Sequence, residues 1–224
     1  MATKQKTKEE VRQENAAEQL SRTEQFYEKN KKWIWGVLIA VLVIWLGSIA
    51  YNRFVYQPKC AEAQEQMFPA ESSFRDGEYE LALNGDGNML GFYQIIDDYG
   101  TKAGKAVYLY AGICELQLGN FQEAIDLLGK YKGKDPILKA RALACQGDAY
   151  VGLGDYPSAI SAFKKAVNVS DNVFAAGYLF KEGLAYKAID DKASALECFK
   201  RIKEYYPQSL ESYDIDRYIS EVSE

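Results

Sequence analysis

Few residues of this sequence could carry chemistry. No histidine occurs anywhere, so the side chain most used for acid–base catalysis near neutral pH, and the commonest metal ligand, is missing. Four cysteines, at positions 60, 114, 145 and 198, form no CxxC pair. Zinc ribbons, thioredoxin-type redox sites and Cys–His nucleophiles therefore lack their required partners. We expect no catalytic residue, no bound metal, no cofactor and no small-molecule substrate, and hence no enzyme.

One glycine-rich stretch, residues 84–88 (NGDGN), has the composition of a calcium-binding loop. An EF-hand loop needs glycine at its sixth position and glutamate at its twelfth. Counted from Asn84, these positions hold Met89 and Ile95. The stretch is better interpreted as a glycine-rich insertion between two helical segments.

Charge separates the N-terminus from the rest of the chain. Residues 1–32 carry eight basic residues against six glutamates, a net charge of +2, whereas the remainder carries 19 basic and 26 acidic residues, a net charge of −7. An acidic domain repels phosphate backbones, and no basic stripe offsets this repulsion. We therefore expect no nucleic-acid partner.

Between the two parts lies a run of nineteen uncharged residues, 33–51 (WIWGVLIAVLVIWLGSIAY). At 1.5 Å per residue a helix of this length covers about 28 Å, close to the thickness of a bilayer's hydrocarbon core. Lys32 and Arg53 bound the run, and aromatic residues stand at both ends, where membrane interfaces favour them. The run predicts a transmembrane helix over residues 33–52.

The orientation of this helix follows from its flanking charges. Basic residues are more numerous on the N-terminal side (Arg22, Lys29, Lys31, Lys32) than on the C-terminal side (Arg53, Lys59). The positive-inside rule then places the N-terminus in the cytoplasm and the remainder in the periplasm of a bacterium. Although residues 48–50 (SIA) resemble a cleavage site, the run is longer than a signal-peptide core and follows a glutamate-rich tail of 32 residues, so we expect it to be retained.

Three segments in the second half of the chain superimpose at spacings of 35 and 36 residues. Residues 140–173 match the tetratricopeptide pattern of large, small and aromatic positions best, and Gly154 stands at the turn between the two helices of the repeat. The matching residues are Leu143, Gly147, Tyr150, Tyr156, Ala159, Phe163 and Ala166.

The neighbouring segments depart from this pattern at a few positions. The segment that begins at Lys105 has Glu115 where an aromatic residue is usual and Tyr131 where a small one is usual. The segment that begins at Ala176 has Asp190 in place of the turn glycine. A degenerate, interrupted repeat precedes all three, with residues 74–79 (FRDGEY) as its turn.

The last segment predicts a helix that caps the array, since one apolar face would cover the final repeat. The residues expected on this face are Leu210, Tyr213, Ile215, Tyr218, Ile219 and Val222. We thus predict an all-α fold: one N-terminal transmembrane helix, then a tetratricopeptide (TPR) α-solenoid of helix–turn–helix repeats with a C-terminal capping helix. The expected parts are a charged cytoplasmic tail (1–32), the transmembrane helix (33–52), a juxtamembrane linker (53–62), the degenerate repeat (63–104), three repeats (105–139, 140–175, 176–209) and the cap (210–224).

The first helices of tetratricopeptide repeats line a concave groove, and here most of the expected groove residues are apolar, which favours an apolar helix or extended segment as ligand. The candidate peptide groove consists of Leu109, Ile113, Leu116, Arg141, Ala144, Asp148, Val151, Phe180, Leu184 and Lys187. The alternative interpretation is that these positions are partly covered by the degenerate repeat and belong to the core.

The apolar run, the stretch 81–104 (LNGDGNMLGFYQIIDDYGTKAG) and the three repeats together resemble the YfgM family of membrane-anchored repeat proteins. The resemblance implies a scaffold at the periplasmic face of the inner membrane that links subunits of the Sec translocon with periplasmic chaperones or clients. The same anchor and groove would also suit an assembly factor for envelope or cytochrome biogenesis complexes.

Overall fold

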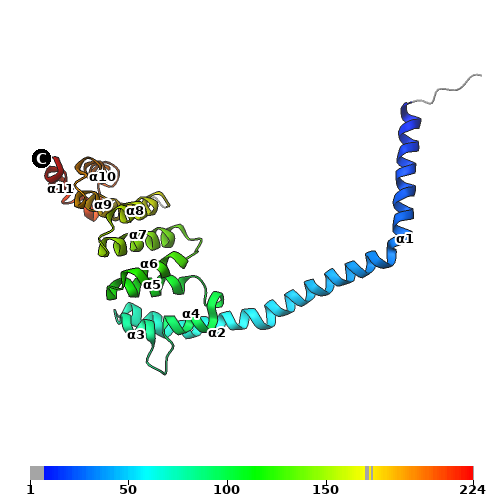
Figure 1. The fold of residues 1–224 in the computed structure, drawn as a ribbon, viewed down its shortest axis with the longest axis horizontal. Coiled ribbons are helices and arrows are strands. Elements are labelled where there is room, and N and C mark those ends of the chain that lie inside the picture. Colours follow the sequence, from blue (N-terminus) through cyan, green and yellow to red (C-terminus); the bar gives the residue numbers. More distant parts are fainter. Residues whose placement is uncertain (1–7, 170–171, 173, 224) are drawn as a thin grey trace, which may run out of the picture. The chain divides into compact units, whose positions relative to one another are not determined.

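The computed structural model describes residues 8–169, 172 and 174–223, with side chains from Phe26 onward and that of Glu24. The chain divides into two compact units, Met1–Gln57 and Pro58–Glu224. The first seven residues of the predicted cytoplasmic tail lie outside the described part, as do the tail's side chains up to residue 23. All of the regular elements in the described residues are helices (Figure 1).

The first unit is helical over its described length. Helix α1 spans Lys8–Tyr51 and is followed by a short π-helix, Asn52–Tyr56. One helical stretch of the described chain, Phe26–Arg75, is long and apolar enough to cross a membrane, and none of its most apolar window is buried. A long helix that is apolar on all sides is consistent with the predicted membrane anchor.

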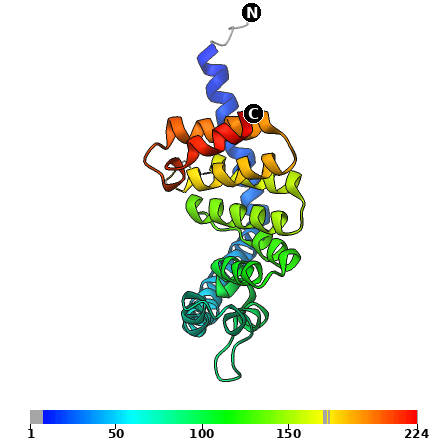
Figure 2. The same ribbon diagram turned by 90° about the vertical axis from the view of Figure 1, so that its left-hand side faces the viewer.

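The second unit is a stack of short antiparallel helices that follow one another in chain order (Figures 1 and 2). Its α-helices are α2 (Gln57–Arg75), α3 (Tyr79–Asn84), α4 (Phe92–Tyr99), α5 (Ala106–Leu118), α6 (Phe121–Lys130), α7 (Pro136–Gly152), α8 (Tyr156–Val169), α9 (Ala175–Ala188), α10 (Lys192–Tyr205) and α11 (Ile215–Ser223). The pairs α5–α6, α7–α8 and α9–α10 are the three predicted repeats.

Each repeat is held together by a glycine of its first helix that faces a large side chain of its second helix. A Cβ atom on Gly147 would lie 2.5 Å from the Phe163 ring, and one on Gly183 would lie 2.5 Å from the Phe199 ring. In the first repeat a Cβ atom on Gly112 would lie 2.6 Å from Leu128. Both rings are fully buried, so the two helices approach until the aromatic side chain fills the space that the glycine leaves.

The turns between paired helices share one geometry. The amides of Asn120, Asp155 and Asp191 each donate to a carbonyl five residues earlier, at 2.9–3.0 Å, as in a Schellman motif. This motif needs a left-handed residue, which is Gly119 in the first repeat (φ 82°) and Gly154 in the second (φ 76°). In the third repeat Asp190 adopts φ 63° and is the one non-glycine residue with positive φ in the described chain, a conformation that an Asp tolerates at some cost.

The degenerate repeat consists of α2 followed by a second helix that is broken into α3 and α4. Between α3 and α4 the carboxylate of Asp86 accepts hydrogen bonds from the amides of Asn88 (2.9 Å) and Met89 (2.8 Å). Gly85 (φ 70°) pairs with Leu90 and closes the loop. The Asp86 carboxylate therefore stabilises the turn between α3 and α4. In the segment 53–62, which we expected to be a juxtamembrane linker, the chain is helical.

The predicted cap differs from the structure at its start. Leu210 and Tyr213 are 84% and 85% exposed, whereas Ile215 and Val222 are buried against the last repeat, with Tyr218 and Ile219 beside them. A 3₁₀ turn over Leu210–Ser212 and a further turn precede α11. Leu210 and Tyr213 precede α11 and do not continue its helical spacing. The prediction that they share the apolar face of α11 was therefore wrong.

The glycine contacts lead to the first prediction. Replacing Gly147 by Ala should destabilise the second unit by about 1–2 kcal/mol, because the overpacking of Phe163 outweighs the gain in helix propensity. The matched control is Gly129→Ala in α6, where the nearest atom to a new Cβ is the flexible Gln146 amide at 3.4 Å. The measurement is the thermal unfolding midpoint by circular dichroism. A G147A variant as stable as G129A would contradict this account.

Candidate protein-binding surface

The structure divides the ten candidate groove residues by their burial. Leu109, Ile113 and Ala144 are buried core residues. Leu116, Asp148 and Phe180 are half-buried. The residues that remain exposed are Arg141, Val151, Leu184 and Lys187. An open groove along the full length of the first helices is therefore not present.

The buried positions pack against the second helix of their own repeat and, for Leu109 and Ile113, against the next first helix as well. Leu109 and Ile113 of α5 pack in one cluster with Ala142 and Ala149 of α7, and Phe74 of α2 packs against the same cluster. At the other end the Phe180 ring meets the Tyr218 ring of α11 edge-on, with centroids 4.8 Å apart. Helix α2 and the cap thus each pack against part of this face, as the alternative interpretation of the groove residues requires.

Two ion pairs lie across the same face. Lys181 of α9 binds Asp148 of α7 at 2.7 Å, and Lys187 of α9 binds Glu221 of α11 at 2.5 Å. All four side chains are partly exposed, so each pair contributes little to the free energy of unfolding. Each pair partly neutralises two charged side chains that a binding partner would otherwise contact as isolated charges.

Apolar side chains that remain exposed gather where each first helix ends. Leu118, Leu153 and Ile189 occupy equivalent positions of the three repeats, 35 and 36 residues apart. We refer to these three residues, with Val151 and Leu184, as the apolar strip; each is 37–49% exposed. Our sequence analysis missed the first three of these residues, although their spacing, equal to that of the repeats, could have revealed them.

The cysteines are unsuited to nucleophilic work. Burial raises the pKa of the Cys114 and Cys198 thiols to about 12 and that of Cys145 to about 11. Reactive cysteines have a lowered pKa, because the thiolate is the nucleophile. Among the described residues no cluster of three or more His, Cys, Asp or Glu side chains could hold a metal ion.

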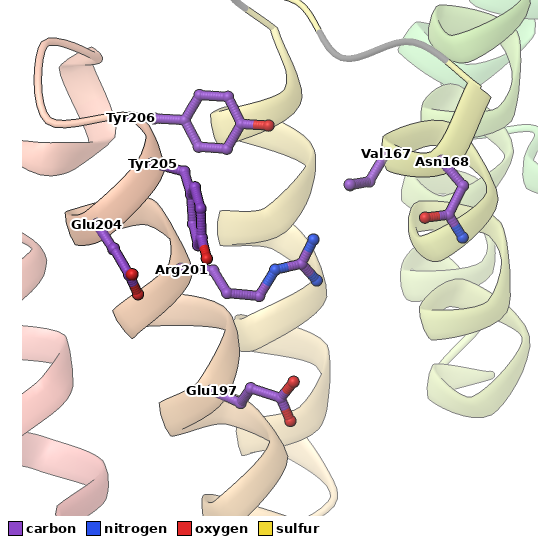
Figure 3. A pocket seen from close by; sticks show the side chains of 7 residues that line it. All are labelled: Val167, Asn168, Glu197, Arg201, Glu204, Tyr205 and Tyr206. Carbon is purple, nitrogen blue, oxygen red and sulfur yellow. The ribbon is translucent and has the colours of Figure 1, made fainter.

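A polar hollow of about 700 Å³ lies between the C-terminal part of α8 and α10 (Figure 3). Figure 3 shows Arg201 extending from α10 toward α8, with Glu197 and Glu204 on the same helix. Tyr205 and Tyr206 complete the wall at the end of α10. Since acidic and basic side chains alternate here, the hollow shows no preference for one sign of charge.

The unusual Glu115 of the first repeat is explained by its neighbours. It is 4% exposed, and its two carboxylate oxygens accept hydrogen bonds from the Tyr93 hydroxyl of α4 and, at 2.6 Å, from the Asn120 amide. Burial and the adjacent carboxylate raise the pKa of Tyr93, so its hydroxyl stays protonated and able to donate. The hydroxyl of Tyr93 thus gives the buried Glu115 carboxylate a hydrogen-bond donor from a neighbouring helix.

A second buried carboxylate, Glu182 of α9, is 2% exposed. Burial raises its pKa, while Lys164 and a hydrogen bond with the Cys198 thiol act in the opposite direction. The Lys164 ammonium lies 5.0 Å from the centre of the Tyr186 ring. This group joins α8, α9 and α10 at the boundary of the second and third repeats.

These features define a class of protein: an α-solenoid of helix–turn–helix repeats with exposed apolar side chains on its first helices. Tetratricopeptide repeat models match residues 106–136, 140–172 and 178–209. The chain is thus a tetratricopeptide repeat protein with a long apolar N-terminal helix, of a scaffold fold that is typically non-catalytic.

A solved structure supports the fold. The crystal structure of MamA protein aligns with a TM-score of 0.53 and 17% sequence identity, over 74% of this chain and 86% of that one. No curated protein matches the sequence significantly. The predicted all-α architecture, a long apolar helix followed by tetratricopeptide repeats, is confirmed.

The Tyr93–Glu115 contact leads to the second prediction. Tyr93→Phe should lower the free energy of unfolding by about 1–3 kcal/mol, because one oxygen of the buried Glu115 loses its donor. Tyr99→Phe on the same helix is the matched control, since Tyr99 donates to the exposed Glu62 at 3.0 Å and should change stability by less than about 0.5 kcal/mol. Urea unfolding of both variants provides the comparison, and equal losses would contradict the proposed role of Glu115.

Glu182 leads to the third prediction. Its folded-state pKa lies above the value of 4.5 usual for the unfolded chain, so the folded protein binds the proton more tightly and loses stability as the pH rises from 4.5 through the folded pKa. Glu182→Gln removes this loss and should stabilise the protein at pH 7 by about 1 kcal/mol, with no gain below pH 4.5.

The control for this prediction is Glu204→Gln on the exposed side of α10, which should leave the pH profile of the unfolding midpoint unchanged. A Glu182→Gln variant that is less stable than the wild type at pH 7 would show that Lys164 and Cys198 more than offset the cost of burying the carboxylate.

Proposed function

We propose that this protein is a membrane-anchored scaffold at the periplasmic face of a bacterial inner membrane. Its repeats would link subunits of the Sec translocon with periplasmic chaperones or clients. The observation that carries the proposal is the apolar strip, which lies on a repeat stack that the chain joins to an apolar helix of membrane length.

The charge and exposure of the N-terminal helix support the anchor. Within the uncharged run 33–51 both Trp33 and Trp45 are exposed, which is costly in water and favourable in lipid. Four basic residues precede the run within twelve positions, and two follow it. Under the positive-inside rule this asymmetry favours a cytoplasmic N-terminus and periplasmic repeats.

The exposed aliphatic residues of the apolar strip favour a protein as the binding partner. Exposed aliphatic side chains in a row on a rigid scaffold are typical of a surface that a second chain covers. No nucleic acid fits the acidic repeat unit, because its charge would repel phosphate. The resemblance to the YfgM family favours the translocon and its chaperones among the possible protein partners.

Photo-crosslinking in cells tests this proposal. A crosslinking amino acid placed at Val151 or Leu184 should capture translocon subunits or periplasmic chaperones, whereas the same group at the exposed Lys200 of α10 should not. Recovery only of cytochrome or envelope assembly machinery would overturn the export role in favour of a tethered assembly factor. Equal yields at Val151 and Lys200 would overturn the role of the strip.

Protease accessibility tests the orientation separately. In spheroplasts, added protease should digest the repeat unit and leave the N-terminal tail protected, and in inverted membrane vesicles the pattern should reverse. Digestion of the repeats only in inverted vesicles would place them in the cytoplasm, and recovery of the whole chain in the soluble fraction would exclude the anchor.

A further inference from the structure

A second candidate surface lies along helix α7, between the second helices α6 and α8 of two neighbouring repeats. Two adjoining hollows of about 480 Å³ and 190 Å³ share Leu143 and Gln146 of α7. The larger is bounded by α6 and the loop that follows it, and the smaller by α8. We call the two together the α7 groove. It contains none of the residues of the apolar strip.

The charge of the α7 groove differs from that of the unit around it. Three lysines line it, Lys132, Lys139 and Lys165, and no carboxylate occurs among its described lining residues. Three acidic residues lie two positions from a lining residue, and each has a partner outside the groove lining. Asp135 is the N-cap of α7 and accepts the Leu138 amide at 2.9 Å, Asp148 pairs with Lys181 at 2.7 Å, and Asp126 accepts a hydrogen bond from Gln122 at 3.3 Å. By contrast, the hollow between α8 and α10 carries two glutamates beside its arginine (Figure 3).

This concentration of lysine stands out because residues 58–224 carry 26 acidic and 18 basic residues. Two further lysines, Lys130 and Lys134, flank the groove in sequence, and Lys105 donates a hydrogen bond to the Lys132 carbonyl at 2.8 Å. The positive charge of the unit is therefore locally concentrated around the loop between α6 and α7. Such a concentration attracts carboxylates.

The dimensions and the lining of the α7 groove suit an extended peptide. From Lys139 to Tyr150 the helix rises about 16 Å, the length of about five residues of extended chain. Leu143 is half-buried and supplies apolar surface above the buried Leu128 and Ala142. Polar side chains stand along the rest of the lining: Gln146, Ser158 and Ser161. A segment that alternates acidic and apolar side chains would satisfy both kinds of surface.

Lipid headgroups fit this site less well. Residues 58–98, which begin the same unit, carry nine acidic and two basic residues. An anionic membrane surface would repel this part of the unit while attracting the lysines. A peptide reaches the groove without bringing a large charged surface close to the acidic helices.

We propose that the α7 groove binds an extended acidic segment of a partner protein, at a site separate from the apolar strip. The protein would then hold two partners, or two parts of one partner, through different chemistries. This goes beyond the scaffold role proposed above, since neither the anchor nor the strip requires it.

The test measures binding by the full-length protein in micelles of an uncharged detergent. A fluorescein-labelled nine-residue peptide of alternating Glu and Leu, with blocked ends, should bind with a Kd that rises with salt, and a Gln–Leu peptide should bind at least tenfold more weakly. Lys139→Gln with Lys165→Gln should weaken the Glu–Leu peptide roughly tenfold.

The matched control is Lys192→Gln with Lys200→Gln, which removes the same charge from exposed positions of α10 and should change the Kd less than twofold. A charge-swapped pair, Lys139→Glu with Lys165→Glu, should bind a Lys–Leu peptide instead. Circular dichroism confirms that each variant is folded.

Three results would overturn the proposal. Equal weakening by the two lysine pairs would show that only the overall charge matters. Equal binding of the Gln–Leu peptide would exclude recognition of carboxylates. Displacement of the peptide by short-chain phosphatidylglycerol at a lower concentration than by unlabelled peptide would assign the groove to a lipid headgroup.

Discussion

The contact between a glycine of one helix and a large buried side chain of the next sets the geometry of this protein. At Gly147 the Phe163 ring occupies the space of the missing side chain, and Gly183 and Phe199 repeat the arrangement. Because the helices of each pair can then approach closely, their remaining apolar surface is left for the neighbouring pair. The close pairing of helices within each repeat follows from this repeated contact.

Where the pattern is broken, the adjoining helices compensate. Glu115 stands where an aromatic residue is usual, and Tyr93 of α4 donates a hydrogen bond to its carboxylate. Asp190 replaces a glycine and keeps the left-handed turn. The departures therefore fall at the boundaries between repeats or at their turns, where a neighbouring element or a small backbone cost can accommodate them.

The two binding surfaces that we propose differ in their chemistry and in the helices that form them. The apolar strip follows the ends of the first helices, whereas the α7 groove lies between second helices and collects lysines in an otherwise acidic unit. The Cys114 and Cys198 thiols lie away from both surfaces, and burial raises their pKa values. A tetratricopeptide fold acts by binding other proteins. The apolar N-terminal helix is long enough to anchor this fold in a membrane.

The sequence by itself determined the helical class, the repeat spacing, the turns and the apolar N-terminal helix, because each depends on residues close together in the chain. It could not determine which first-helix residues stay exposed. Leu109 and Ile113 are covered by α7, and Phe180 by α11, through contacts between elements far apart in sequence. The exposure of Leu210 and Tyr213 was likewise decided by a turn that shifts the helical period. The α7 groove draws its lining from three elements, so only the tertiary structure, which brings those elements together, could reveal it.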